Sequence, residues 1–136
     1  MKTVSAVALG VALVMPLPAG AADVTGTWNT GKARVRIADC GAALCATITA
    51  LNEPNDAAGK PKTDRNNADP AKRSRRIVGI PILSGMKPAG NDVWKGDIYN
   101  PEDGKTYAAS MSLQGASLKV EGCALAIICR TQVWNR

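Results

Sequence analysis

Residues 92–113, DVWKGDIYNPEDGKTYAASMSL, predict a β-hairpin. Pro101 presets φ for a type I turn, and Gly104 can adopt the left-handed conformation that closes the hairpin. After the turn, alternate residues fall on opposite faces, which is typical of a strand with one buried side. One face collects Tyr107, Ala109, Met111 and Leu113, and the other face collects Ala108, Ser110 and Ser112.

Similar alternating stretches occur on both sides of this hairpin, most of them joined by short turns. The polar segment 52–74 is expected to be a long loop, and no long helical period follows residue 22. Sequential hairpins favour strands that close on themselves and leave no free edge. We therefore predict an all-β, eight-stranded antiparallel up-and-down barrel, with a β-sandwich as the alternative. The expected strands are 24–29, 33–39, 46–51, 76–83, 92–99, 105–113, 117–122 and 128–135.

Residues 1–22 have the pattern of a signal peptide. Lys2 precedes the apolar run 4–15, prolines follow, and the small residues 19–22 suit signal peptidase. The run is shorter than the about 20 residues of a membrane span, so a retained anchor is the less favoured alternative. We expect cleavage near residues 21–23, a periplasmic or secreted location, and one domain over 23–136. No later segment is expected to span a membrane.

The composition argues against common kinds of catalysis. The chain has 136 residues and no histidine, which excludes Ser-His-Asp and Cys-His systems and histidine-bound zinc. No other nucleophile motif is present. We therefore expect no enzymatic activity and no cofactor.

Positive charge is concentrated in the segment 60–76. The chain has a net charge of +6. The charge of this segment indicates either a binding site for an anionic surface or a solvated loop that keeps the protein soluble. Nucleic acid is not expected, because no aromatic residues alternate with the basic ones. The basic residues are Lys60, Lys62, Arg65, Lys72, Arg73, Arg75 and Arg76, and the acidic ones are Asp64 and Asp69.

Four cysteines form two close pairs. In an exported chain they indicate two disulfides, with a tetrathiolate zinc site as the alternative, although the spacings lack the usual C-x2-C knuckles. Three connectivities are possible. We predict the local one, Cys40–Cys45 and Cys123–Cys129, because each pair flanks a short hairpin tip.

The chain resembles a family of small exported bacterial proteins known as domain of unknown function 2147, which is similar to lipocalins. This resemblance implies a lipocalin-like barrel and structural roles for Trp28, Trp134 and a C-terminal arginine, Arg136 or Arg130, that covers Trp28. It implies no established activity. The matching stretches are 26–28, 40–45, 64–67, 76–85, 94–107 and 122–136.

Three aromatic residues are candidates for the wall of a ligand cavity: Trp94, Tyr99 and Tyr107. Trp94 and Tyr99 can both point inward only if a bulge intervenes, for which Gly96 is the expected place; without a bulge, Trp94 points inward and Tyr99 does not. The alternative is that all three aromatics belong to the core. Asp64 and Asn66 are candidates for gating or contacting a ligand, or for an Asx turn.

The favoured function is an exported ligand-binding protein of the bacterial envelope that holds one small apolar molecule in the barrel. The alternative is a non-enzymatic structural or interaction protein of the envelope that uses its surface or the segment 60–76.

Overall fold

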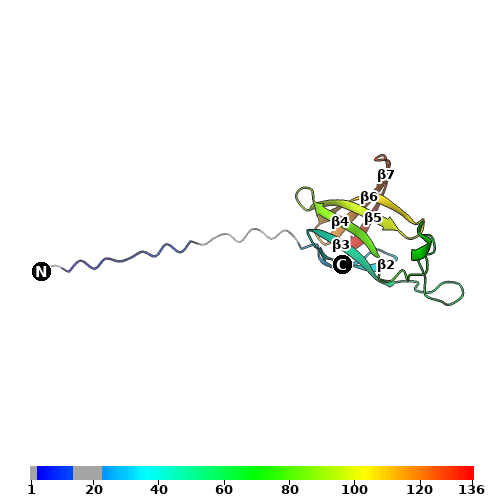
Figure 1. The fold of residues 1–136 in the computed structure, drawn as a ribbon. Helices are drawn as coiled ribbons and strands as arrows, with labels where there is room; N and C mark the ends of the chain where they lie inside the picture. Colours follow the sequence, from blue (N-terminus) through cyan, green and yellow to red (C-terminus); the bar gives the residue numbers. More distant parts are fainter. Residues whose placement is uncertain (1–2, 14–22) are drawn as a thin grey trace.

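The computed structural model describes residues 3–13 and 23–136 (Figure 1). Residues 3–13 have no regular secondary structure, and the small residues 19–22, expected at the signal-peptidase site near residues 21–23, lie outside the described residues. Within the described ranges, no helix is long and apolar enough to cross a membrane.

Eight antiparallel strands close into a barrel in sequence order, which confirms the predicted fold. The barrel closes where β1 pairs with β8, through Asn29 and Asn135. One short 3-10 helix, η1 (Pro70–Lys72), interrupts the long β3–β4 connection. The strands are β1 (Gly26–Asn29), β2 (Ala33–Cys40), β3 (Ala43–Leu51), β4 (Pro81–Pro88), β5 (Val93–Asn100), β6 (Lys105–Gln114), β7 (Ser117–Ala124) and β8 (Ile128–Asn135).

The fourth strand differs from the sequence prediction. The expected strand 76–83 is wrong, because β4 begins only at Pro81. Gly79 has φ +104, a conformation that breaks a strand. Ile77 and Ile80 are nevertheless buried in the core, so the apolar run reflects how the end of the loop packs rather than strand pairing.

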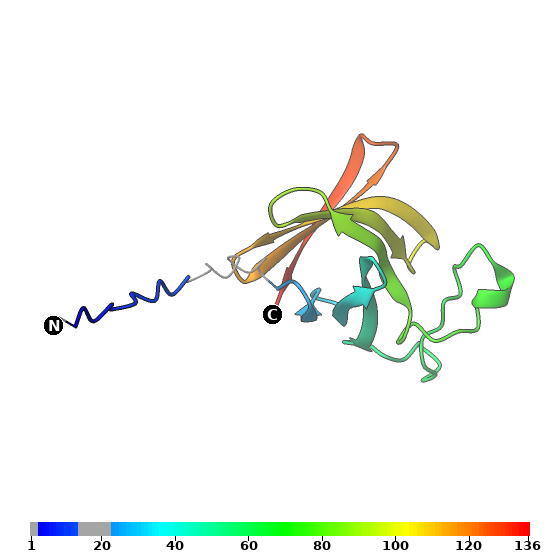
Figure 2. The ribbon, with the colours of Figure 1, turned by 60° about the vertical axis from the view of Figure 1, so that its left-hand side comes forward.

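The up-and-down order places the connections alternately at the two ends of the barrel (Figure 2). We call one end the loop end; it carries the connections 30–32, 52–80, 101–104 and 125–127. The opposite end carries the connections 41–42, 89–92 and 115–116, and we call it the terminal end because the chain finishes there.

Gly96 is not the site of a bulge. The β5–β6 register runs without a shift, whereas β4 is irregular between Ser84 and Lys87, where Gly85 has φ +60. A Cβ atom on Gly96 would lie 2.5 Å from the Ser84 carbonyl oxygen, so glycine there lets the bulged β4 backbone approach. Because β5 is regular, Trp94 and Tyr99 lie on opposite faces of the strand.

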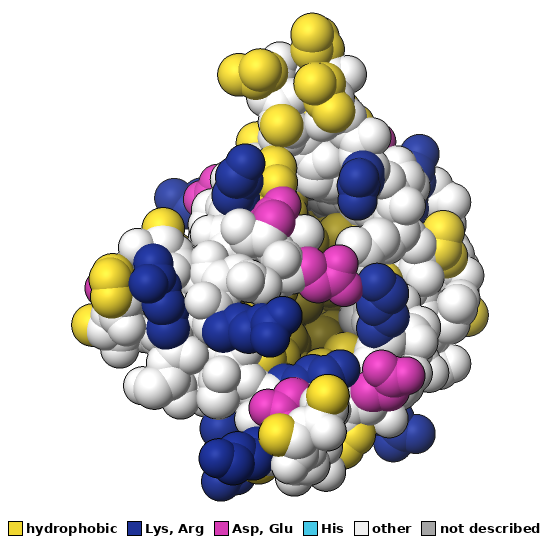
Figure 3. Space-filling view, turned by 90° about the vertical axis from the view of Figure 1, so that its right-hand side faces the viewer, with side chains coloured by type: hydrophobic (Ala, Val, Ile, Leu, Met, Phe, Trp, Pro, Cys, Tyr) yellow, Lys and Arg dark blue, Asp and Glu magenta, His cyan; other side chains and the backbone are white. Residues whose placement is uncertain are grey.

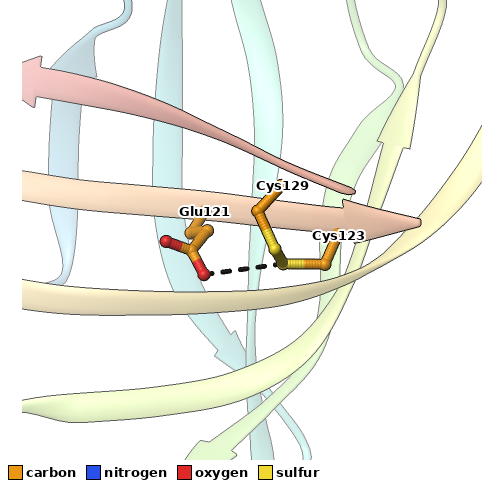
Figure 4. Close-up of side chains that lie close together, drawn as sticks. All are labelled: Glu121, Cys123 and Cys129. Atoms are coloured by element: carbon orange, nitrogen blue, oxygen red, sulfur yellow. Dashed lines mark hydrogen bonds between the residues drawn. A yellow bond between two sulfur atoms is a disulfide. The ribbon is translucent and has the colours of Figure 1, made fainter. Parts of the chain in front are cut away.

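Both disulfides have the predicted local connectivity. Cys40–Cys45 closes the β2–β3 turn, and Cys123–Cys129 joins directly paired residues of β7 and β8. Glu121 lies beside the second disulfide, with its Oε1 3.5 Å from the Cys123 sulfur (Figure 4). Sulfur atoms joined in a disulfide carry no proton and are not thiolate ligands for a metal ion. While the bond is intact, Cys123 and Cys129 therefore serve as a structural link between β7 and β8.

Candidate functional site

The loop end of the barrel is hollowed. Figure 3 looks onto this end and shows an opening with hydrophobic side chains at its base and charged side chains of both signs around its rim. The opening extends along β8. Every second residue of a strand faces the same side, so Gln132 and Arg130 share the inward face of β8 with the buried Trp134. Both residues are nevertheless exposed. The interior is therefore accessible to solvent on this side.

The inner layer nearest the opening is formed by Ile98, Tyr107 and Gly122. Ile98 pairs with Tyr107 across β5 and β6, and a Cβ atom on Gly122 would lie 3.1 Å from Ile98 Cγ2 and 3.8 Å from Tyr107 Cβ. All three residues are half-buried, whereas Met111 and Val120, deeper on the same faces, are buried. Glycine at 122 therefore lets Ile98 pack close to the β7 backbone, and a side chain there would have to displace Ile98 at the base of the opening.

Tyr107 is fixed at the rim by its hydroxyl group, which donates to a carboxylate oxygen of Asp103. This hydrogen bond raises the pKa of Tyr107, with burial and the Asp103 charge acting in the same direction, while Arg130 opposes them. Arg130 is the cross-strand partner of Gly122, whose Cβ position lies 3.8 Å from Tyr107 Cβ. The sequence candidate Tyr107 therefore belongs to the opening.

Asp64 is fully buried in a polar cluster that joins the β3–β4 loop to β5. Its carboxylate accepts hydrogen bonds from the Tyr99 hydroxyl (2.6 Å), the Asn67 side-chain amide (2.8 Å) and Arg75 Nε (2.9 Å). The Arg75 guanidinium also lies 5.9 Å from the centre of the Tyr99 ring. Asp64 and Tyr99 therefore fasten the loop to the barrel, and the carboxylate has no free face for a ligand.

The cluster shifts the pKa of two of its members. Burial alone would raise the pKa of Asp64, but the hydrogen bonds from Tyr99, Asn67 and Arg75 and the charge of Arg75 outweigh it and hold the pKa below 3.8. Burial raises the pKa of Tyr99 above 10.0, and the hydrogen bond to Asp64 and its charge add to this effect. Asp64 is thus ionised and Tyr99 neutral at neutral pH.

These shifts predict a pH dependence of stability. Because the pKa of Asp64 is lower in the folded state, its contribution is present above pH 3.8 and is lost as the pH falls through the folded-state pKa. Because the pKa of Tyr99 is higher in the folded state, folding stability should also fall as the pH rises above 10.0. Urea unfolding across the acid range should show the stability gap between wild type and Asp64→Asn narrowing below pH 3.8. Asp97→Asn, an exposed carboxylate of β5, is the control, and a constant gap would contradict the assignment.

Asn66 holds the same loop to the β5–β6 turn. Its side-chain amide donates to the Glu102 carbonyl (3.0 Å) and the Pro101 carbonyl (3.3 Å). A Cβ atom on Gly104 would lie 1.8 Å from the Asn66 carbonyl oxygen, so this close contact requires glycine. Asn66 therefore holds the β3–β4 loop at the rim through its hydrogen bonds to the backbone of the β5–β6 turn.

The structure separates Trp94 from the other two candidate aromatics. Trp94 is buried near the terminal end, where it lines an open depression of about 230 Å³ with Leu44, Met86 and Pro88. Tyr99 and Tyr107 lie near the loop end on opposite faces of the sheet. Trp94, Tyr99 and Tyr107 therefore do not form one wall.

The arginine that covers Trp28 is Arg136. Its guanidinium carbon lies 4.2 Å from the centre of the Trp28 ring, and its nitrogens donate to the carbonyls of Asp23 (2.5 Å) and Thr25 (3.5 Å). The Trp28 indole nitrogen donates to the Val24 carbonyl (2.9 Å). Trp28 and Arg136 border an open depression of about 290 Å³, and the buried Trp134 donates to Gln132 (3.1 Å).

The basic residues of segment 60–76 divide into two groups. Arg75 forms an ion pair with Asp64, and Arg73 Nε donates to the Asn67 carbonyl (2.8 Å). Lys62 Nζ lies 3.7 Å from Glu53 Oε2. The other four are exposed and have no acidic partner within 4.0 Å among residues 3–13 and 23–136. These four, which we call the free loop cations, are Lys60, Arg65, Lys72 and Arg76.

Sequence reasoning missed the parts of the site that depend on contacts between distant segments. Arg75, 11 residues after Asp64, completes the Asp64 cluster, and no sequence pattern pairs these two residues. Nothing in the sequence distinguished Gly122 from a turn glycine, because its role depends on Ile98 and Tyr107 across the sheet.

Comparison with known proteins agrees with this architecture. A protein of the human pathogen Helicobacter pylori, described as belonging to the lipocalin family, has a similar solved structure, with a TM-score of 0.72 and 22% sequence identity. The match covers 84% of this chain and 82% of that chain, and it shows a shared fold. No curated protein matches the sequence. A family of uncharacterized proteins conserved in bacteria, DUF2147, matches residues 26–136, and the chain belongs to this family.

Proposed function

We propose that this chain is an exported, non-enzymatic binding protein of the bacterial envelope that holds one small apolar molecule at the loop end of its barrel. The signal-peptide pattern of residues 1–22 supports export. The lipocalin-like fold supports the ligand class, because an eight-stranded barrel of this kind is wide enough for one small molecule.

The observation that carries the proposal is the apolar base of the opening. Ile98 and Tyr107 face inward there, and Gly122 lets both side chains lie close over its backbone, so the base is an apolar surface. An apolar group placed on this base would be removed from water, which is favourable by about 25 cal/mol per Å² of buried apolar surface. The charged rim, including Arg130, would remain in contact with solvent and with any polar end of the ligand.

Filling the base should abolish binding. In a thermal-shift screen of fatty acids, retinoids, sterols and quinones, a ligand present at a hundred times its dissociation constant should stabilise the fold by about 2.7 kcal/mol. Gly122→Leu should remove this stabilisation, because the new side chain occupies the space beside Ile98 and Tyr107.

Ala108→Leu is the control, because it places the same leucine side chain on the exposed outer face of β6. Isothermal titration of both variants with any hit gives the dissociation constants. Equal affinity of Gly122→Leu and wild type would place the ligand elsewhere, and the absence of any hit would count against the proposal.

The free loop cations support a second candidate function: interaction with an anionic surface of the envelope. Replacing Lys60, Arg65 and Lys72 with neutral residues tests this interaction. The replacements leave Arg73 and Arg75, which hold the loop in place, unchanged. This binding should weaken steeply as salt rises, because exposed charges are screened over about 10 Å at 0.1 M ionic strength.

A further inference from the structure

The β7–β8 hairpin ends in an exposed apolar tip, residues 124–128 (Ala-Leu-Ala-Ile-Ile). Leu125 is 85% exposed, Ile127 83% and Ile128 63%. Figure 3 shows these side chains as a hydrophobic projection that stands clear of the rest of the molecule, with Lys and Arg side chains on both sides of its base. Large apolar side chains gathered on a projection contribute nothing to the core and mark an interaction site.

The backbone of the tip is also unfavourable for its sequence. Leu125 and Ala126 have φ +55 and +60, a conformation that L side chains rarely adopt. Other turns of this barrel place glycine at such positions, as at Gly41, Gly104 and Gly115. A leucine and an alanine in this turn therefore serve neither local folding nor solubility.

The disulfide at the base keeps the tip projecting. Cys123 and Cys129 are direct cross-strand partners just below residues 124–128, and their bond ties the two strands together there (Figure 4). The exposed apolar side chains thus stand on a covalently closed support, which reduces the conformational freedom lost when the tip binds.

We propose that this tip inserts into the interfacial region of an anionic lipid bilayer. The inference goes beyond the proposed ligand site, because the tip lies outside the barrel opening. A bilayer fits the tip better than a second copy of the chain, because a stable protein interface uses about 20–30 residues on each side and the tip offers a short turn. A bilayer interface accepts a few apolar side chains without a shaped partner surface.

The charge around the tip agrees with an anionic surface. Arg130 is exposed two residues after Ile128, and Figure 3 shows Lys and Arg side chains on both sides of the base of the tip. Basic side chains beside an inserted apolar segment are attracted by anionic headgroups, and this attraction falls off within a Debye length.

Vesicle sedimentation tests the proposal with oxidised protein of residues 23–136. This part contains every strand of the barrel, and it omits the apolar run 4–15, which could bind lipid by itself. Wild type should sediment with vesicles of phosphatidylethanolamine and phosphatidylglycerol and bind phosphatidylcholine vesicles less. The triple variant Leu125→Asn, Ala126→Gly, Ile127→Ser should bind the anionic vesicles at least tenfold more weakly.

The variant separates binding from folding, because asparagine and glycine suit the left-handed turn. Its melting temperature should equal or exceed that of wild type. Val133→Ser, which removes an exposed apolar side chain from the outer face of β8, should leave vesicle binding unchanged.

Equal binding by the triple variant and wild type, or no binding by wild type, would overturn the proposal. A wild-type dimer that the triple variant converts to a monomer would instead assign the tip to contact between copies. Loss of the ligand response in Gly122→Leu with retained vesicle binding would show that the two sites are independent.

Discussion

Replacing Trp28 with alanine should lower the free energy of unfolding by about 3–5 kcal/mol, the usual cost of removing a buried tryptophan. Trp28 is fully buried, and its ring lies beneath the Arg136 guanidinium at 4.2 Å. The substitution leaves a cavity in the core, removes this cation–π contact and removes the donor to the Val24 carbonyl. It also loosens the region where β1, paired with β8 only through Asn29 and Asn135, closes the barrel.

Urea unfolding followed by circular dichroism measures the effect. Arg136→Ala is the companion variant, and it should cost about 0.5–2 kcal/mol, because it removes the cation and leaves the core filled. A loss below 1 kcal/mol in Trp28→Ala would contradict the role of Trp28 as a main component of the core.

Replacing Asp64 with alanine should have the second largest effect, a loss of about 2–4 kcal/mol. Removing one member of a buried ion pair costs about 3–5 kcal/mol, but the Arg75 side chain is 36% exposed, so solvent recovers part of this cost. The Tyr99 hydroxyl and the Asn67 amide lose their acceptor at the same time.

Tyr99→Phe is the matched control for this cluster. It removes one donor and leaves the carboxylate bound to Asn67 and Arg75, so it should cost about 1 kcal/mol. Hydrogen exchange should locate the change. Asp64→Ala should increase exchange in the β3–β4 loop, at Ile77 and Ile80 above all, while the β6–β7 pair stays protected. Uniform loss of protection would contradict a local anchoring role.

The architecture follows from the sequence because hairpins are local. The alternation of β6 and the turn at Pro101 and Gly104 specify a register that needs no distant contact. The same locality explains why both disulfide pairings were predictable. The expected strand 76–83 was wrong because an apolar run specifies burial but not pairing, and Ile77 and Ile80 are buried from within a loop.

The candidate site was less predictable, since its geometry depends on contacts across the barrel. Whether Trp94 and Tyr99 share a face depends on which strand carries the bulge, and β4 carries it at Gly85 while β5 remains regular. The sequence makes Asp64 a candidate for contacting a ligand, but its buried position depends on Arg75 and Tyr99, which lie 11 and 35 residues away.

The local disulfides have a consequence for how the chain acquires its covalent structure. The paired cysteines are 5 and 6 positions apart, whereas Cys45 and Cys123 are 78 positions apart along the chain. An oxidant that joins thiols in the order in which they emerge therefore produces the native bonds directly, first Cys40 with Cys45 and later Cys123 with Cys129. Sequential oxidation would therefore reach these two bonds without reshuffling.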